Sequence, residues 1–133
     1  MPDPNPIQFI FNENLDRPFL EELFNGDFTY AEDVFADFLS DLPSYWQDVE
    51  TAWQQQQVTE LRAAVHKCKT LFGYVGLTSI QQFCQEFEDH CIDAIGTIGA
   101  LTHQYELLFR HKEAAWQLIE AEHSRLQRFN GTD

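Results

Sequence analysis

One histidine and one lysine, three positions apart in the run VHKCKT, could together carry a phosphoryl group. His66 and Lys69 lie one helical turn apart, so a helix places both side chains on one face. An imidazole nitrogen can form a covalent bond to phosphorus, and a lysine ammonium group can hold the phosphoryl oxygens. Gly73, seven positions after His66, adds no side chain to this face. The spacing therefore predicts an exposed histidine that another protein can reach.

The helix that presents His66 is indicated by an apolar stripe on its other side. Apolar residues recur at spacings of four, three, four and three, at Leu61, Val65, Cys68, Phe72 and Val75. This period places them in one line against a core and leaves His66 outside the line. We expect the helix to run from about residue 59 to residue 74 and to be broken by Gly76.

The charge of the chain is strongly negative, which excludes nucleic acid and anionic membranes as its main partners. The formal net charge is −14, so phosphate backbones and acidic lipids would be repelled. Residues 1–50 hold twelve acidic side chains and a single base, whereas Arg62, Lys67 and Lys69 surround His66. This group of cations would attract a phosphoryl group, although lysines also gather on surfaces by chance.

Length and composition predict one domain. The 133 residues can bury a single core. No apolar run approaches the length of a membrane-spanning helix, and Met1–Pro6 lacks the basic start of a signal peptide. The odd number of cysteines, Cys68, Cys84 and Cys91, at core-like positions predicts buried reduced thiols and no disulfide framework. These features favour a cytoplasmic protein.

Helical periodicity extends over nearly the whole chain, and its first half should form two helices. Asp16 should cap a short helix that Asn25-Gly26 ends. A capping box, with Thr29 at the N-cap and Glu32 three positions later, should start a long helix. We expect that helix to continue, kinked, through Pro43 and to end in the glutamine run 54–57.

The second half of the chain repeats this pattern. A second capping box, Thr78 with Gln81, should start the helix that follows the histidine helix. Residues 95–99 should form the turn into a last helix over residues 100–129. Because that helix is longer than its neighbours, its far end should extend beyond the other helices.

These elements predict an all-α protein, an antiparallel up-down-up-down four-helix bundle with a short N-terminal capping helix and a long C-terminal helix. Residues 16–129 should form the bundle, residues 1–15 an N-terminal arm laid on it, and residues 130–133 a C-terminal tail. One chain provides all four helices, so we expect a monomer.

The residues around His66 resemble the histidine-containing phosphotransfer (HPt) domains of multistep two-component phosphorelays. Lys69 follows the histidine by three positions and Gly76 by ten, and the apolar helix of Cys84, Phe87 and Cys91 comes next. The length, the helical pattern and the place of the histidine on the second long helix also match. The likeness covers the whole predicted bundle.

This resemblance implies that His66 accepts a phosphoryl group from the phosphoaspartate of one receiver domain and passes it to the aspartate of another. The partners would be the receiver domains of hybrid histidine kinases and of response regulators. Lys69 would hold the phosphoryl oxygens, while Gly73 and Gly76 would keep the docking face low. No cofactor is expected in this chain, because the Mg²⁺ ion would belong to the receiver domain. In a eukaryote such a carrier could also enter the nucleus.

Thr70 departs from the pattern of the family, which has glycine four positions after the histidine. A threonine adds bulk where the receiver docks, or its hydroxyl donates a hydrogen bond to a phosphoryl oxygen. Leu71 also replaces a commonly small polar residue and should widen an apolar docking patch. The departure leaves a second interpretation open, in which the protein cannot be phosphorylated and instead docks on a receiver or kinase and inhibits it.

Residues of the neighbouring helices should complete the site. The helix after Gly76 runs back along the histidine helix, so Gln85 and Glu88 should come level with His66 and orient the imidazole. Glu88 could equally be a solvated surface residue. Phe19 and Leu23 of the short helix should give the docking surface an apolar centre.

Other classes of function fit the sequence less well. A di-iron bundle needs two Glu-x-x-His pairs and further carboxylates, whereas this chain has one pair, Glu120 with His123. We therefore expect no metal site and interpret His90, His103 and His111 as surface histidines or as histidines satisfied by structural hydrogen bonds. No phosphate-binding glycine loop or kinase signature is present, so no ATP-dependent kinase activity is expected.

Overall fold

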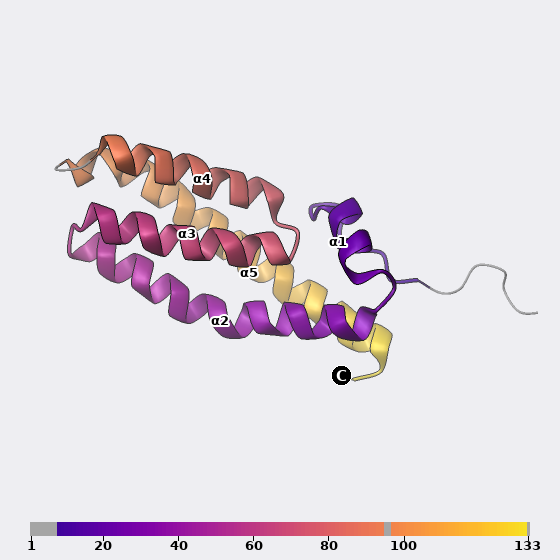
Figure 1. Cartoon of the computed structure of the whole chain (residues 1–133). Coiled ribbons are helices and arrows are strands. Elements are labelled where there is room, and N and C mark those ends of the chain that lie inside the picture. The colour runs from indigo at the N-terminus through magenta and orange to yellow at the C-terminus, as the bar shows by residue number, and fades with distance from the viewer. Residues whose placement is uncertain (1–7, 95–96, 133) are drawn as a thin grey trace, which may run out of the picture.

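The computed structural model describes residues 8–94 and 97–132, and within them the backbone forms helices and no strand. In chain order the helices are α1 (Arg17–Phe24), α2 (Phe28–Gln54), α3 (Val58–Tyr74), α4 (Thr78–Asp93), the short 3-10 helix η1 (Ile98–Leu101) and α5 (Thr102–Asn130). Helices α2 to α5 pack side by side, and each runs opposite to the one before it (Figure 1). The predicted all-α four-helix bundle is confirmed.

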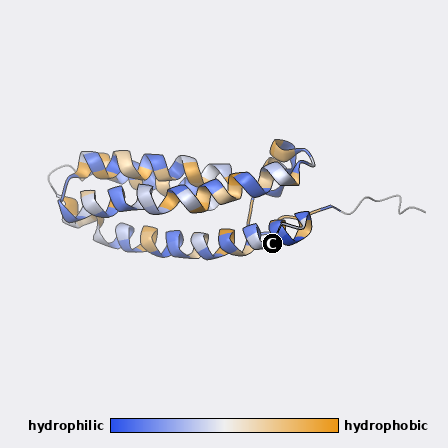
Figure 2. Ribbon diagram, turned by 90° about the horizontal axis from the view of Figure 1, so that it is seen from below, coloured by the Kyte–Doolittle hydropathy of each residue, from blue (hydrophilic) through white to orange (hydrophobic). Residues whose placement is uncertain are grey.

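Each long helix buries one apolar side and exposes a polar side, so apolar and polar residues alternate along it with the helical period (Figure 2). The stripe predicted for α3 is buried at all five positions, Leu61, Val65, Cys68, Phe72 and Val75. Helix α2 packs its own buried row against α3 and α5, so the inner side of α3 is fully covered. The outer side of α3 remains open, and this is the side that carries His66.

Helix α2 continues through Pro43 as a single helix, as predicted. Proline has no backbone N–H, so one hydrogen bond of the helix is missing at this position. Leu42 and Trp46 on either side are buried in the core and hold the helix together across the gap. The helix ends at Gln54, inside the predicted glutamine run.

Both predicted capping boxes are wrong. Helix α2 starts two residues early because Asp27 is its N-cap, and the Asp27 carboxylate accepts a hydrogen bond from the backbone N–H of Tyr30 at 3.0 Å. Asn25 ends α1 in the left-handed conformation, so the chain turns early and Asp27 stands directly before α2, where it can cap that helix. In α4, Thr78 is already helical and its hydroxyl donates to Asp16 Oδ2 at 3.1 Å. Its side chain therefore serves α1 and not its own helix.

The part of the N-terminal arm that the structure describes, residues 8–15, packs on the end of α5. Phe9 and Phe11 are buried among aromatic side chains of α1, α2 and α5. The backbone N–H of Asn12 donates to Glu122 Oε2 at 2.5 Å, and Glu122 is itself buried and paired with Arg125. Arg125 also donates to the carbonyl of Ile10 at 2.9 Å. Hydrogen bonds to the buried Glu122 and to Arg125 thus hold the arm on the last helix.

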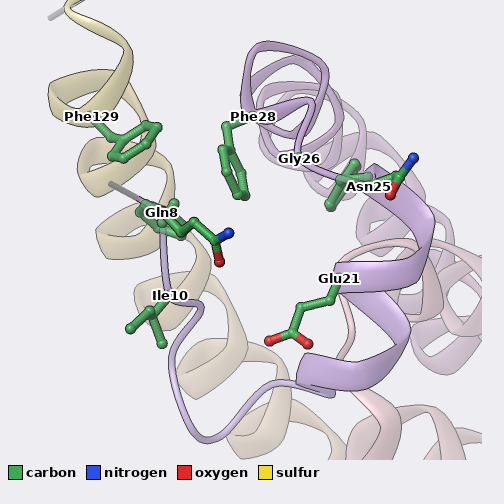
Figure 3. Close-up of a pocket in the computed structure, with 9 residues that line it drawn as sticks. Gln8, Ile10, Glu21, Asn25, Gly26, Phe28 and Phe129 are labelled. Carbon is green, nitrogen blue, oxygen red and sulfur yellow. The ribbon is translucent and has the colours of Figure 1, made fainter. Parts of the chain in front are cut away.

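A cavity of about 540 Å³ lies between the arm, α1 and the facing ends of α2 and α5. Phe28 and Phe129 stand at one side of it, while Gln8 and Glu21 point into it from opposite walls (Figure 3). The arm therefore bridges the space between α1 and α5 and does not fill it.

Helix α5 matches the predicted long last helix, but its start and end differ. It begins at Thr102, after η1, and it includes Asn130, which was predicted to belong to the tail. Residues 95 and 96 of the predicted turn lie outside the described residues. Asn130 donates to the carbonyl of Phe28 at 2.9 Å and to Glu32 Oε1 at 3.0 Å. Hydrogen bonds from Thr132 and Asn130 lower the pKa of Glu32 and tie the end of α5 to the start of α2.

Candidate phosphoacceptor site

His66 lies in the middle of α3, and its side chain is 60 % exposed. Its neighbour Val65 and the next stripe residue, Cys68, are buried, so the backbone under the imidazole is firmly packed. His66 Nδ1 lies 2.9 Å from Glu88 Oε1. Because a carboxylate can only accept, the ring proton belongs on Nδ1 and the lone pair on Nε2. The nitrogen outside this hydrogen bond is therefore the nucleophilic one.

Glu88 on α4 is the centre of the site. Its side chain is only 5 % exposed, and its second oxygen, Oε2, lies 2.8 Å from Lys69 Nζ. One buried carboxylate thus joins the histidine and the lysine of α3. Burying a carboxylate is costly unless it is paired and hydrogen-bonded. Here Oε1 is hydrogen-bonded to His66, whereas Oε2 makes no hydrogen bond among the described residues and is stabilised by the charge of Lys69. The interpretation of Glu88 as a solvated surface residue is wrong.

Lys69 is held in place by one hydrogen bond and one ion pair to α4. In addition to Glu88, its Nζ donates to Gln85 Oε1 at 2.6 Å, and Gln85 in turn donates to Asp89 at 3.1 Å. An ammonium group has three N–H donors. One of them is donated to Gln85, so N–H donors remain for an acceptor beside His66. The structure therefore brings the predicted Gln85 and Glu88 level with the histidine.

Thr70 follows His66 by one turn and is exposed. Its hydroxyl donates back to the carbonyl of His66 at 3.4 Å, so in this structure the hydroxyl is turned toward the helix backbone. Leu71, which was predicted to widen an apolar docking patch, is buried and therefore adds little exposed area of its own. It lies beneath a hollow that it lines together with Leu23, Tyr30 and Tyr74.

The two glycines after the histidine have different roles. A Cβ on Gly73 would lie 2.5 Å from Gln81 Nε2, so this glycine makes room for a side chain of α4 to lie across α3. Gly76 was predicted to keep the docking face low, but it is buried under α1. Its φ of +76° suits glycine, and a Cβ there would lie 2.9 Å from Leu20 Cδ1. Gly76 thus permits the close approach of α1.

An apolar surface adjoins the histidine on the side of α1. Phe19 and Leu23, predicted for docking, are each 41 % exposed on this helix. The structure adds Tyr30 and Tyr74, which are also exposed and which the sequence analysis missed. In the sequence, each of these tyrosines lies outside the apolar stripe of its helix, and this position could have indicated an exposed aromatic side chain. We call Phe19, Leu23, Tyr30 and Tyr74 the α1 surface.

The remaining predicted residues lie on the exposed side of their helices. Arg62 and Lys67 are exposed on α3, and neither forms an ion pair among the described residues. Within residues 8–94 and 97–132, no three His, Cys, Asp or Glu side chains are grouped as metal ligands, Glu120 and His123 included. In the same ranges no helix is long and apolar enough to cross a membrane.

The three cysteines are unpaired and buried, as predicted. Burial raises the pKa of Cys68 to about 12 and that of Cys91 to about 11, and it raises the pKa of Cys84 further. These thiols pack the interface between α3 and α4 beneath the site. They are poor nucleophiles at neutral pH, so they do not compete with the histidine.

The model of the Hpt domain family matches residues 33–129 of the chain. The chain belongs to the Hpt domain family. No curated protein and no solved structure matches it. Membership implies histidine phosphotransfer in phosphorelays and interaction with receiver domains. The matched part of this Hpt domain includes His66, Lys69 and Glu88, whereas α1 with Phe19 and Leu23 lies before it.

Proposed function

We propose that this Hpt domain is a phosphorelay carrier. Nε2 of His66 accepts a phosphoryl group from the phosphoaspartate of a receiver domain in a hybrid histidine kinase and passes it to the aspartate of a response regulator. The observation that carries the proposal is the exposed imidazole whose Nδ1 is held by the buried carboxylate of Glu88 at 2.9 Å. A histidine that is fixed at one nitrogen and open at the other is prepared to act as a nucleophile.

The transfer exchanges one bond for another without a cofactor in this chain. The lone pair of Nε2 attacks phosphorus, the bond between phosphorus and the aspartyl oxygen breaks, and the aspartate leaves as a carboxylate. Nδ1 keeps its proton, so the phosphorylated ring carries a positive charge. Glu88 stabilises that charge at a distance of 2.9 Å. Attack by the aspartate of the second receiver reverses each of these changes.

Lys69 has two tasks in this proposal. Its ion pair with Glu88 stabilises the buried carboxylate while the histidine is unphosphorylated. When a phosphoryl group arrives, a free N–H of Lys69 binds one of its oxygens and stabilises the developing charge. Gln85 holds the lysine on the side of α4, beside His66. The Mg²⁺ ion that neutralises the other oxygens would come with the receiver domain.

The α1 surface gives the receiver a place to dock. Phe19 and Tyr74 line a hollow together with Thr70, which is one turn after His66, and Leu23 and Tyr30 line a second hollow together with Tyr74. The cations Arg62 and Lys67 lie on the exposed side of α3 together with the histidine. An apolar centre with a polar rim is the usual arrangement of a transient protein interface.

The experiment for this proposal uses a small phosphodonor and needs no receiver. The purified protein is incubated with phosphoramidate, and its intact mass is compared with that of the His66→Gln variant. We expect one acid-labile phosphoryl adduct on the wild-type protein and none on the variant. A folded wild-type protein without an adduct would contradict the carrier function and favour a docking module that cannot be phosphorylated.

A further inference from the structure

A hollow of about 350 Å³ lies beside the phosphoacceptor site, between the start of α1, the end of α3 and the start of α4. Its polar lining consists of Asp16, Thr70, Thr78 and Gln81, and its aromatic lining of Phe19 and Tyr74. Thr70 is one helical turn from His66, and Tyr74 is two turns away. The hollow is therefore part of the surface that a molecule bound over His66 would cover.

The carboxylate of Asp16 is held rigidly at this hollow. Its Oδ1 accepts from the backbone N–H of Phe19 at 3.2 Å, and its Oδ2 accepts from the Thr78 hydroxyl at 3.1 Å. The backbone N–H of Asp16 donates to the carbonyl of Gly76 at 2.9 Å. A carboxylate has about four acceptor positions, so two remain after these bonds. Three segments of the chain thus hold Asp16 in place, and its carboxylate can still accept about two more hydrogen bonds.

The chemistry of the lining selects the class of group that fits. Asp16 supplies a negative charge, and the two threonines and Gln81 supply further oxygens. Among the residues that the structure describes, no lysine, arginine or histidine lines the hollow. Phe19 and Tyr74 are 41 % and 55 % exposed, so parts of both rings are open to a partner. A planar cation that stacks on rings and donates several hydrogen bonds matches this lining, and among side chains this is the guanidinium of arginine.

We propose that the hollow receives an arginine side chain of the docked receiver domain, with Asp16 as its ion-pair partner. This inference rests on the proposed carrier function, because it names a feature of the receiver that docks at the same surface. The arginine would lie one to two helical turns along α3 from the phosphoryl group, about 6–11 Å. Thr70 then forms one wall of a recognition pocket, which gives the departure from the family's glycine a role in partner choice.

The test measures binding of an isolated arginine side chain by two-dimensional ¹H–¹⁵N NMR. The full chain is titrated with N-acetyl-arginine methylamide at constant ionic strength. The neutral isostere N-acetyl-citrulline methylamide is titrated in parallel. We expect the arginine probe to bind with a Kd on the order of 10 mM, since one partly exposed ion pair is weak by itself. Binding should change the chemical shifts of the backbone amide signals of Thr70, Gly73, Thr78 and Gln81. The citrulline probe should leave these amides unchanged.

Two variants of α1 localise the binding. Asp16→Asn keeps one oxygen to cap the helix at Phe19, and its NH2 group, in place of the second oxygen, can donate to the Thr78 hydroxyl. The substitution removes the charge, so the protein folds and its affinity for the arginine probe falls about fivefold or more. Glu22→Gln removes an exposed charge of the same helix that does not line the hollow, and it should leave the affinity unchanged.

Three results would overturn the arginine pocket. These are equal shifts with citrulline, no effect of Asp16→Asn, or the same loss of affinity in both variants. The phosphoramidate experiment is independent of this titration. A His66 adduct without arginine binding would leave the carrier function standing, whereas arginine binding without an adduct would overturn the carrier function alone.

Discussion

Glu88 lies 2.9 Å from His66 Nδ1, although 22 residues separate them in the chain. The contact exists because α4 runs back along α3 after the tight turn at Gly76. It determines which ring nitrogen is available for chemistry. Several properties of the protein should depend on this pair and on the surface beside it.

Removing the Glu88 carboxylate should slow phosphorylation of His66. In Glu88→Ala, Nδ1 loses its acceptor and Lys69 loses its ion pair, which removes charged hydrogen bonds worth about 1.5–3 kcal/mol. We expect the rate with phosphoramidate to fall roughly 10- to 100-fold, while Glu88→Gln, which keeps an acceptor for Nδ1, retains more of it. Time-resolved intact mass measures both rates. An unchanged rate in the folded alanine variant would contradict the orienting role of Glu88.

The two lysines that flank Cys68 should differ in their importance. Lys69 contacts Gln85 and Glu88, whereas Lys67 is exposed, so Lys69→Gln should lower the phosphoramidate rate roughly tenfold and Lys67→Gln by less than twofold. The same mass measurement applies. Equal losses in the two variants would show that general positive charge acts here, and not the placement of Lys69.

Phe19 should affect transfer between proteins and not the chemistry at the histidine. Phe19→Ala removes an exposed ring of the α1 surface, so we expect weaker binding of a receiver domain that exchanges phosphate with the wild-type protein, by about 1 kcal/mol or more. The phosphoramidate rate should stay the same. Ile92→Ala is the matched control, because Ile92 is exposed on α4 outside this surface. Calorimetric titration of the receiver with all three proteins checks this, and unchanged affinity in Phe19→Ala would exclude Phe19 from the interface.

Glu122 should be a major contributor to stability. It is 1 % exposed and accepts from Asn12 and Arg125, so Glu122→Gln weakens the hold of the arm on α5. We expect a loss of about 1–3 kcal/mol in the free energy of unfolding, measured by urea denaturation. Glu120→Gln, at an exposed position of the same helix, should change it by less than about 0.5 kcal/mol. Similar losses in both variants would contradict the anchoring role of Glu122.

The buried cysteines should make the protein less stable at alkaline pH. Their pKa values are raised in the folded state, to about 12 for Cys68 and about 11 for Cys91, above the ordinary value of about 8.5 in the unfolded chain. A raised folded pKa gives stability that is complete below about pH 8.5 and is lost as the pH rises toward these values. Urea denaturation at pH 7 and at pH 10 should show this decrease. It should be smaller in a variant with all three cysteines replaced by alanine, and an equal decrease would assign the effect to other groups.

The sequence was sufficient to predict the bundle and the residues level with the histidine, because both depend on helical period and on the direction of neighbouring helices. The stripe from Leu61 to Val75 and the placement of Glu88 follow from that geometry alone. The contacts of α1 and of the N-terminal arm do not follow from helical period or helix direction. Asp16 binds Thr78 across 62 residues, and Glu122 binds Asn12 across 110. No local pattern indicates such pairs, and the first of them is the reason why the predicted capping box at Thr78 failed.

The measurement that tests the central claim most directly identifies the phosphorylated ring nitrogen. The protein, labelled with ¹⁵N-histidine, is phosphorylated with phosphoramidate, and long-range ¹H–¹⁵N and ³¹P spectra assign the nitrogen of His66 that is bonded to phosphorus. Because Nδ1 is held by Glu88 at 2.9 Å, the account predicts phosphorus on Nε2 and a proton on Nδ1. Phosphorus on Nδ1 would contradict it, since the bond to Glu88 would then have to be broken for the histidine to react.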